Sequence, residues 1–185
     1  MFSFDKNVTC CFTGHRPSKL PCGGRRYSRE IEVLYRMLNY EIRYAHSKGF
    51  VNFVSGMAQG FDMLAAECVL QNAKELGIRL VCAIPSINQT DKWTEQWRKK
   101  YDELVDDSSI IVYTEYEYTK NSYMKRNRYM VDNSGLVIAC YNQSSADYRS
   151  GTGATVRYAE KNGVPVVNLW NCWEVSPDER IVRFV

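Results

Sequence analysis

Two glycine-rich segments of this 185-residue chain have the composition of loops that bind phosphate. The first, residues 55–62 (SGMAQGFD), separates an apolar run from a segment with helical periodicity. Free N–H groups and the dipole at a helix start attract anions, and Gly56 and Gly60 allow a phosphate to approach the backbone closely. Asp62, in the first helical turn, is placed to accept a hydrogen bond from a ribose hydroxyl. Alternatively, Asp62 only favours the helix dipole and the glycines only turn the chain.

The second segment, residues 142–153 (NQSSADYRSGTG), carries Thr152 between two glycines to the start of another predicted helix. This pattern predicts a second anion-binding helix start. Alternatively, Thr152 is only the N-cap of that helix, a position where Ser and Thr are common. Because two such junctions occur in one chain, we interpret both as parts of one phosphate site.

Residues 13–17 (TGHRP) supply a guanidinium group for such a phosphate. Gly14 permits a tight turn or a close backbone approach, and Arg16 offers a planar fork of donors that suits phosphate or carboxylate. The alternative is a solvated arginine in an ordinary turn. The segment is therefore a candidate part of the site rather than a site by itself.

A second basic segment, residues 125–128 (KRNR), begins another predicted helix. A solvated helix face is the usual role of such a charge run. Arg126 and Arg128 are two residues apart and cannot share one helix face, so at most one of them is expected to point to the ligand. Asn127, between them, is expected to bond the backbone or the ligand.

Candidates for acid–base chemistry are few. His15 can titrate near neutral pH, and Asp62 and Glu67 are the other weak candidates for a catalytic role. No serine or cysteine motif accompanies His15, so a hydrolytic triad is not expected. The chain has two histidines and seven scattered cysteines without the spacing of a zinc site, so no metal is predicted and no cofactor is identified.

Alternating apolar and helical segments indicate the scaffold that positions these residues. Short apolar runs, rich in Val, Ile and Cys and typical of strands covered on both faces, alternate with helical patterns, which predicts an α/β fold with a mostly parallel sheet between helices, a Rossmann-like three-layer sandwich. The predicted strands are 8–13, 51–55, 80–84, 109–113, 135–141 and 164–169, and the predicted helices are 27–48, 61–76, 90–105, 122–131 and 152–161. We expect one domain over residues 1–185, with its core in 8–169.

Parallel strands end at one edge of a sheet, and ligands bind outside their carboxyl ends. Trp93 and Trp97, four residues apart, are expected on one face of the third helix, a spacing more typical of core than of a platform for a base. The tail after Trp170 is expected to be irregular or a short strand. The candidate ligand-binding residues are Gly14, His15, Arg16, Ser55, Gly56, Gln59, Gly60, Asp62, Arg126, Asn127, Arg128, Gly151, Thr152 and Gly153.

The overall composition narrows the class of protein. The formal charge of +3 and the isoelectric point near 8.4 are too mild to indicate a nucleic-acid binder. Seven cysteines without a Cys-x-x-Cys pair indicate a reduced, intracellular protein. The N-terminal residues lack the pattern of an export signal, and no window approaches the length of apolar sequence that spans a bilayer. We therefore expect a cytoplasmic protein without a membrane partner.

Taken in order, residues 13–17, 54–62, 126–130, 150–153 and 163–166 resemble the motifs of the SLOG superfamily. The resemblance is closest to its YpsA-like branch, with similarity to DprA in the second, fourth and fifth segments, and it covers residues 8 to 169. It implies a Rossmann-like fold, a crevice for a nucleotide-derived ligand such as ADP-ribose or an NAD-related molecule, and self-association into a homo-oligomer.

The superfamily includes three activities. LOG enzymes are phosphoribohydrolases that cleave a nucleoside monophosphate at its ribose, DprA binds single-stranded DNA, and YpsA-like proteins are thought to sense or regulate. The LOG signature carries a catalytic glutamate, whereas the matching stretch here has Val156 and Arg157 at the acidic positions, with Glu160 one turn later. We therefore expect a ligand-binding sensor or regulator, with a nucleotide-processing enzyme as the alternative and binding of single-stranded DNA as the third possibility.

Overall fold

A single parallel β-sheet organises the chain in the computed structural model, which describes residues 3–25, 27–144, 147–170 and 172. Its six strands lie in the order β4-β3-β2-β1-β5-β6, and every neighbouring pair is parallel. The strands are β1 (Thr9–Gly14), β2 (Asn52–Ser55), β3 (Arg79–Ile84), β4 (Ile110–Tyr113), β5 (Leu136–Cys140) and β6 (Val166–Asn168). The predicted α/β, Rossmann-like sandwich is confirmed.

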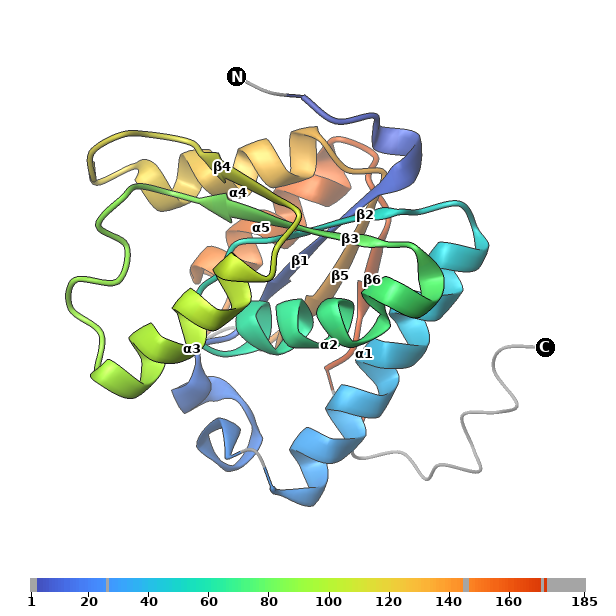
Figure 1. Ribbon diagram of the computed structural model, residues 1–185, viewed down its shortest axis with the longest axis horizontal. Helices are drawn as coiled ribbons and strands as arrows, with labels where there is room; N and C mark the ends of the chain where they lie inside the picture. Colours follow the sequence, from blue (N-terminus) through green and yellow to red (C-terminus); the bar gives the residue numbers. More distant parts are fainter. Residues whose placement is uncertain (1–2, 26, 145–146, 171, 173–185) are drawn as a thin grey trace.

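Helices cover both faces of this sheet (Figure 1). They are α1 (Arg29–Ser47), α2 (Phe61–Leu76), α3 (Glu95–Asp106), α4 (Ser122–Asp132) and α5 (Gly151–Lys161). Successive strand residues point to opposite faces, so Cys10 and Phe12 of β1 pack with α1, α2 and α3, whereas Cys11 packs with α4 and α5. Two apolar layers therefore enclose the strands, as their nearly continuous runs of apolar residues predict.

The strand order places a topological switch point at β1. From β1 the chain builds β2, β3 and β4 on one side and β5 and β6 on the other, and β1 pairs with β5 over Cys10–Gly14 and Leu136–Cys140. In open parallel sheets the ligand crevice lies outside the carboxyl ends of the strands at such a point. The segments that leave β1 and β5 are therefore expected to form the ligand site.

The third helix starts later than its apolar pattern predicts. It begins at Glu95 rather than at residue 90, because residues 90–94 form a turn in which the Trp93 amide donates to the Thr90 carbonyl, 2.9 Å away. Trp93 thus precedes the helix and does not share a helix face with Trp97, contrary to prediction. Instead its ring meets that of Tyr101 edge-on, with centroids 5.6 Å apart.

Three further sequence-based expectations concern the membrane, the cysteines and the tail. Within the described residues, every helix is too short or too polar to cross a bilayer. The six cysteines whose side chains are described are buried, and burial raises the pKa of the Cys68 and Cys82 thiols to about 12. The expected irregular or short-strand tail lies largely outside the described residues.

An added side chain at Gly60 should destabilise the fold. At the start of α2 it has φ 101°, and a Cβ there would lie 2.5 Å from the His15 carbonyl oxygen. We expect Gly60→Ala to lower the free energy of unfolding by about 3 kcal/mol. Gly77→Ala is the matched control, because Gly77 also has positive φ (67°) but open space around it, and its cost should be about 1 to 2 kcal/mol. Equal losses in urea denaturation of the two variants would contradict the close packing at Gly60.

Candidate functional site

The starts of α2 and α5 meet at the carboxyl end of β1. The Thr152 hydroxyl of α5 donates to the Gly14 carbonyl at 2.9 Å, and the Phe61 amide of α2 donates to the His15 carbonyl at 3.2 Å. The two glycine-rich segments therefore contact neighbouring residues, Gly14 at the end of β1 and His15 directly after it. The two helix starts are brought together at the topological switch point.

The β2–α2 segment, residues 55–62, is held mainly by the protein's own groups. The Met57 amide donates to the Ser55 hydroxyl (3.1 Å) and the Ala58 amide to the Asp62 carboxylate (3.4 Å). The Gln89 side-chain amide donates to the Met57 carbonyl at 2.7 Å, which helps to hold Met57 at φ 53°, a rare value for a residue with a side chain. Within this segment, Gln59 is the residue that stays partly exposed.

A buried ion pair lies behind this segment. The Arg126 guanidinium donates to the Gly56 carbonyl and lies 3.7 Å from the Asp62 carboxylate, with only 3% and 6% of these two residues exposed. Burial raises the pKa of Asp62, while the charges of Arg126 and Arg16 oppose that rise. Burial also lowers the pKa of Arg126, and the charge of Asp62 opposes it. Asp62 is thus engaged within the protein, at the position where the sequence predicts a ribose contact.

The glycines of the first segment are packed against protein atoms. A Cβ on Gly56 would overlap the Arg126 guanidinium, and one on Gly60 would press on the backbone of His15 and Arg16. The close approach that the sequence predicts therefore exists, but a guanidinium and a neighbouring loop occupy it. The physical reason is that a glycine leaves room for any group, and the sequence alone does not identify which group fills it.

Arg16 is the guanidinium that faces solvent at this edge. Its side chain is exposed and has no ion-pair partner among the residues that the structure describes. Its Cζ lies 5.9 Å from the ring centroid of Tyr123, and the Arg126 Cζ lies 6.0 Å from the same centroid. Stacking on Tyr123 orients Arg16 beside the two helix starts while its donors remain available.

His15 joins the segments that follow β1 and β5. Its Nε2 accepts a hydrogen bond from the Asn142 amide at 2.9 Å and lies 3.9 Å from the Asp147 carboxylate, which also pairs with Lys19. Burial lowers the pKa of His15; Asp147 opposes this effect and Lys19 adds to it. A neutral imidazole that accepts at Nε2 fits this environment. In this arrangement the ring fastens two loops together.

The start of α5 differs in one detail from the prediction. Ser150, not Thr152, is the N-cap, because its hydroxyl accepts from the Gly153 amide at 3.0 Å. Thr152 instead makes the contact to β1 described above. Gly151 is exposed at the first position of the helix, whereas a Cβ on Gly153 would lie 2.8 Å from the Asp147 and Tyr148 carbonyl oxygens.

Three predicted residues make contacts elsewhere. Asn127 donates to the Thr155 hydroxyl at 2.9 Å and so ties α4 to α5. Arg128 lies over the ring of Tyr158 (5.5 Å), on a different side from Arg126, as their spacing predicts. Glu67 pairs with Lys100 (2.9 Å) in a groove of about 870 Å³ between residues 17–25, α2 and α3.

Sequence reasoning missed three contributors: Gln89, Tyr123 and the Lys19–Asp147 pair. Gln89 lies five residues beyond the end of β3, so the rule that loops after strands line the crevice could have indicated it. Asp147 lies inside the second glycine-rich segment. No local pattern marks Tyr123. Among the described residues, no three His, Cys, Asp or Glu side chains gather as ligands for a metal ion.

Comparison with known proteins agrees with this architecture. A model of the YspA SLOG family (YpsA) matches residues 10–170. The "uncharacterized SPbeta prophage-derived protein YoqJ" of Bacillus subtilis is 27% identical over 161 residues, which cover 80% of this chain and 85% of that protein.

Two solved structures of DNA processing protein A (DprA) are similar in fold. The Helicobacter pylori protein, described with its single-stranded DNA binding mode, has a TM-score of 0.57 and 21% identity over 88% of this chain. The Streptococcus pneumoniae protein has a TM-score of 0.54 and 18% identity over 98% of this chain. The chain spans only 65% and 57% of those two chains, respectively.

The environment of His15 predicts a pH-dependent stability. A histidine with a pKa below its ordinary 6.5 contributes stability that is present above that value and is lost as pH falls through the folded value. We therefore expect the free energy of unfolding to decrease as the pH is lowered from about 7 to about 5. The decrease should be smaller in His15→Gln. Urea denaturation across this range measures it. Equal slopes in wild type and His15→Gln would contradict the role of His15.

Removal of the buried Arg126 guanidinium should lower the free energy of unfolding strongly. Arg126→Met leaves Asp62 buried without its partner and should destabilise the protein by about 3 to 5 kcal/mol. The double variant with Asp62→Asn should lose clearly less than the sum of the two single changes, because the two residues interact directly. Arg128→Met, on the exposed side of α4, should stay within about 0.5 kcal/mol of wild type. Additive losses would show that the pair is not coupled.

Proposed function

Because this chain belongs to the YspA SLOG family, we propose that the loops at the carboxyl ends of β1 and β5 bind the phosphate of a nucleotide-derived ligand, such as ADP-ribose or an NAD-related molecule. In this proposal the protein is a cytoplasmic sensor or regulator that self-associates. The ligand is held at the starts of α2 and α5 and by the Arg16 side chain.

The single observation that carries the proposal is the position of Arg16. An exposed guanidinium, oriented by Tyr123, lies next to the starts of two long helices, and the segment that carries it contacts both helices through Gly14 and His15. Helix dipoles and a guanidinium fork favour the same ligand, a phosphate. Gly151, at the start of α5, is exposed and Gln59, two residues before α2, is partly exposed, so both are available to contact the ligand.

The contacts of the acid–base candidates support binding over catalysis. His15 accepts a backbone hydrogen bond at Nε2, Asp62 pairs with Arg126, and Glu67 pairs with Lys100. At the positions of the LOG signature, Val156 is buried in the core, and Arg157 donates to the Tyr148 carbonyl at 2.5 Å. A general acid or base must reach the reacting atoms, and these groups are engaged elsewhere. Incubation with a panel of nucleotides followed by chromatography should therefore yield no product above the control without protein.

Single-stranded DNA is the second candidate ligand, favoured by the fold shared with the two DprA proteins. The mild net charge of +3 argues against it, because binding to the DNA backbone requires many cations. Gel shifts at two salt concentrations separate the two ligands: strong, salt-dependent retardation of a single strand would favour DNA.

The proposal predicts a separable effect of Arg16. Arg16→Ala should weaken the binding of ADP-ribose by about 1.5 to 3 kcal/mol, or roughly 10- to 150-fold, because one charge-assisted contact is lost. The thermal midpoint should stay at the wild-type value, since the side chain is exposed. Titration calorimetry measures the affinity. Arg128→Ala, an exposed arginine on the other side of α4, should bind as wild type does; unchanged affinity in Arg16→Ala would overturn the proposal.

A further inference from the structure

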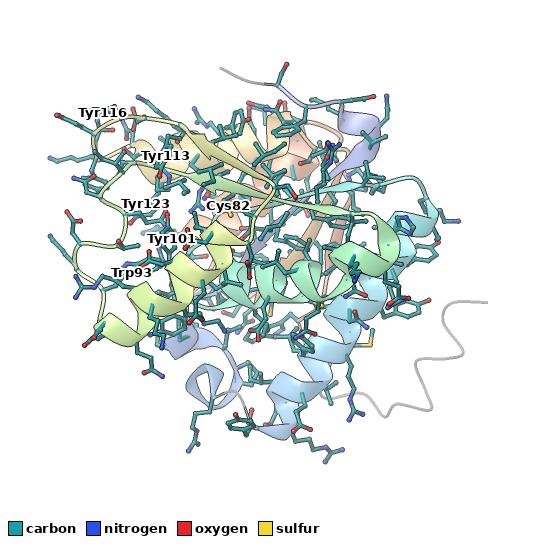
Figure 2. All side chains as sticks on the ribbon, viewed as in Figure 1. Cys82, Trp93, Tyr101, Tyr113, Tyr116 and Tyr123 are labelled. Carbon is teal, nitrogen blue, oxygen red and sulfur yellow. The ribbon has the colours of Figure 1, made fainter. Side chains whose placement is uncertain are left out.

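Exposed tyrosines follow the edge strand β4, close to the proposed site. Tyr113, at the end of β4, is 49% exposed, and Tyr116 and Tyr118 in the next segment are 76% and 53% exposed. Figure 2 shows Tyr113, Tyr116 and Tyr123 on the same side of the molecule, above Tyr101 and Trp93. Solvent-exposed aromatic side chains do not stabilise the core, so these tyrosines are a candidate binding surface.

The segment that carries these tyrosines is held in place by Glu115. Its carboxylate accepts hydrogen bonds from the Lys125 ammonium, the Ser122 hydroxyl and the Thr119 hydroxyl, and all three interactions lower the pKa of Glu115. The Ile87 amide also donates to the Tyr116 carbonyl at 3.4 Å. Tyr118 is therefore exposed on a fixed segment, as a preorganised binding residue should be.

A continuous series of contacts connects this segment to Arg16. The rings of Tyr118 and Tyr123 meet edge-on with centroids 5.9 Å apart, and Arg16 lies over Tyr123 at 5.9 Å. Arg126 also lies over the Tyr123 ring, at 6.0 Å; it is 97% buried, and its Nε has no hydrogen-bond partner in the described structure. An aromatic pair thus extends away from the guanidinium that the proposed function assigns to phosphate.

Building on the proposed function, we infer that Tyr118 and Tyr123 form a stacking subsite for the nucleobase of the ligand whose phosphate Arg16 holds. The ligand class is then a nucleotide with a flat heteroaromatic base, rather than a phosphorylated sugar alone. Tyr118 offers an exposed ring for the base to stack on, and Tyr123 orients both Tyr118 and Arg16. Stacking of this kind accepts any base, because every base has a π-face.

The test compares a ligand that has a base with one that lacks it. Calorimetry with ADP-ribose and with ribose 5-phosphate should show that Tyr118→Ala weakens the first about tenfold and the second less than twofold, while Tyr118→Phe restores binding. Arg16→Ala should weaken both, because both carry a phosphate. Tyr27→Ala is the matched control, since Tyr27 is 88% exposed and lies just before α1.

A spectroscopic measurement reports stacking itself. The fluorescence of 1,N6-etheno-ADP-ribose should be quenched by wild type and by Tyr118→Phe but not by Tyr118→Ala. If Arg16→Ala weakens ADP-ribose and Tyr118→Ala does not, the subsite is wrong and the proposed function stands. If Tyr118→Ala weakens both ligands equally, the residue acts on the fold of the loop and the inference fails. If neither ligand binds wild type, the proposed function and the subsite both fall.

Discussion

The Arg126 guanidinium, buried between the β2–α2 segment and α4, is the group on which the rest of the site depends. It binds the Gly56 carbonyl and faces the Asp62 carboxylate, so it joins two elements 70 residues apart in the chain. A buried charge requires such partners, and the surroundings must supply them without moving. Arg126 therefore holds residues 55–62 at Gly56 and Asp62, while Gln89 holds the unusual backbone of Met57 between them.

Because residues 55–62 are held by protein contacts, these contacts determine which backbone amides can still bind a ligand. The amides of Met57, Ala58, Phe61 and Gly153 already bond protein oxygens, so only part of each helix start remains available. Arg16 differs from these groups, because it is exposed, stacks on Tyr123 and forms no ion pair with the residues that the structure describes. Arg126 is buried and holds the scaffold, whereas Arg16 is exposed and faces solvent. For this reason only Arg16 is proposed to bind the ligand.

The carboxyl ends of β1 and β5 are linked to each other as well as to the helices. His15 receives a hydrogen bond from Asn142, and Asp147 pairs with Lys19 across the same gap. The two loops that follow β1 and β5 are thus connected through a titratable ring and an ion pair. On the far side, the segment fixed by Glu115 brings exposed aromatic rings to the same edge of the sheet.

The sequence by itself determined the strands, the parallel sheet and the edge where the loops gather, because runs of apolar residues and helical periods are local patterns and parallel strands end on one side. Only the tertiary structure decided that Arg126 turns inward and Arg128 outward, that Gly56 makes room for a guanidinium, and that Tyr123 lies between two arginines. These outcomes depend on groups far apart in the chain, and no local pattern records which distant group fills a given space.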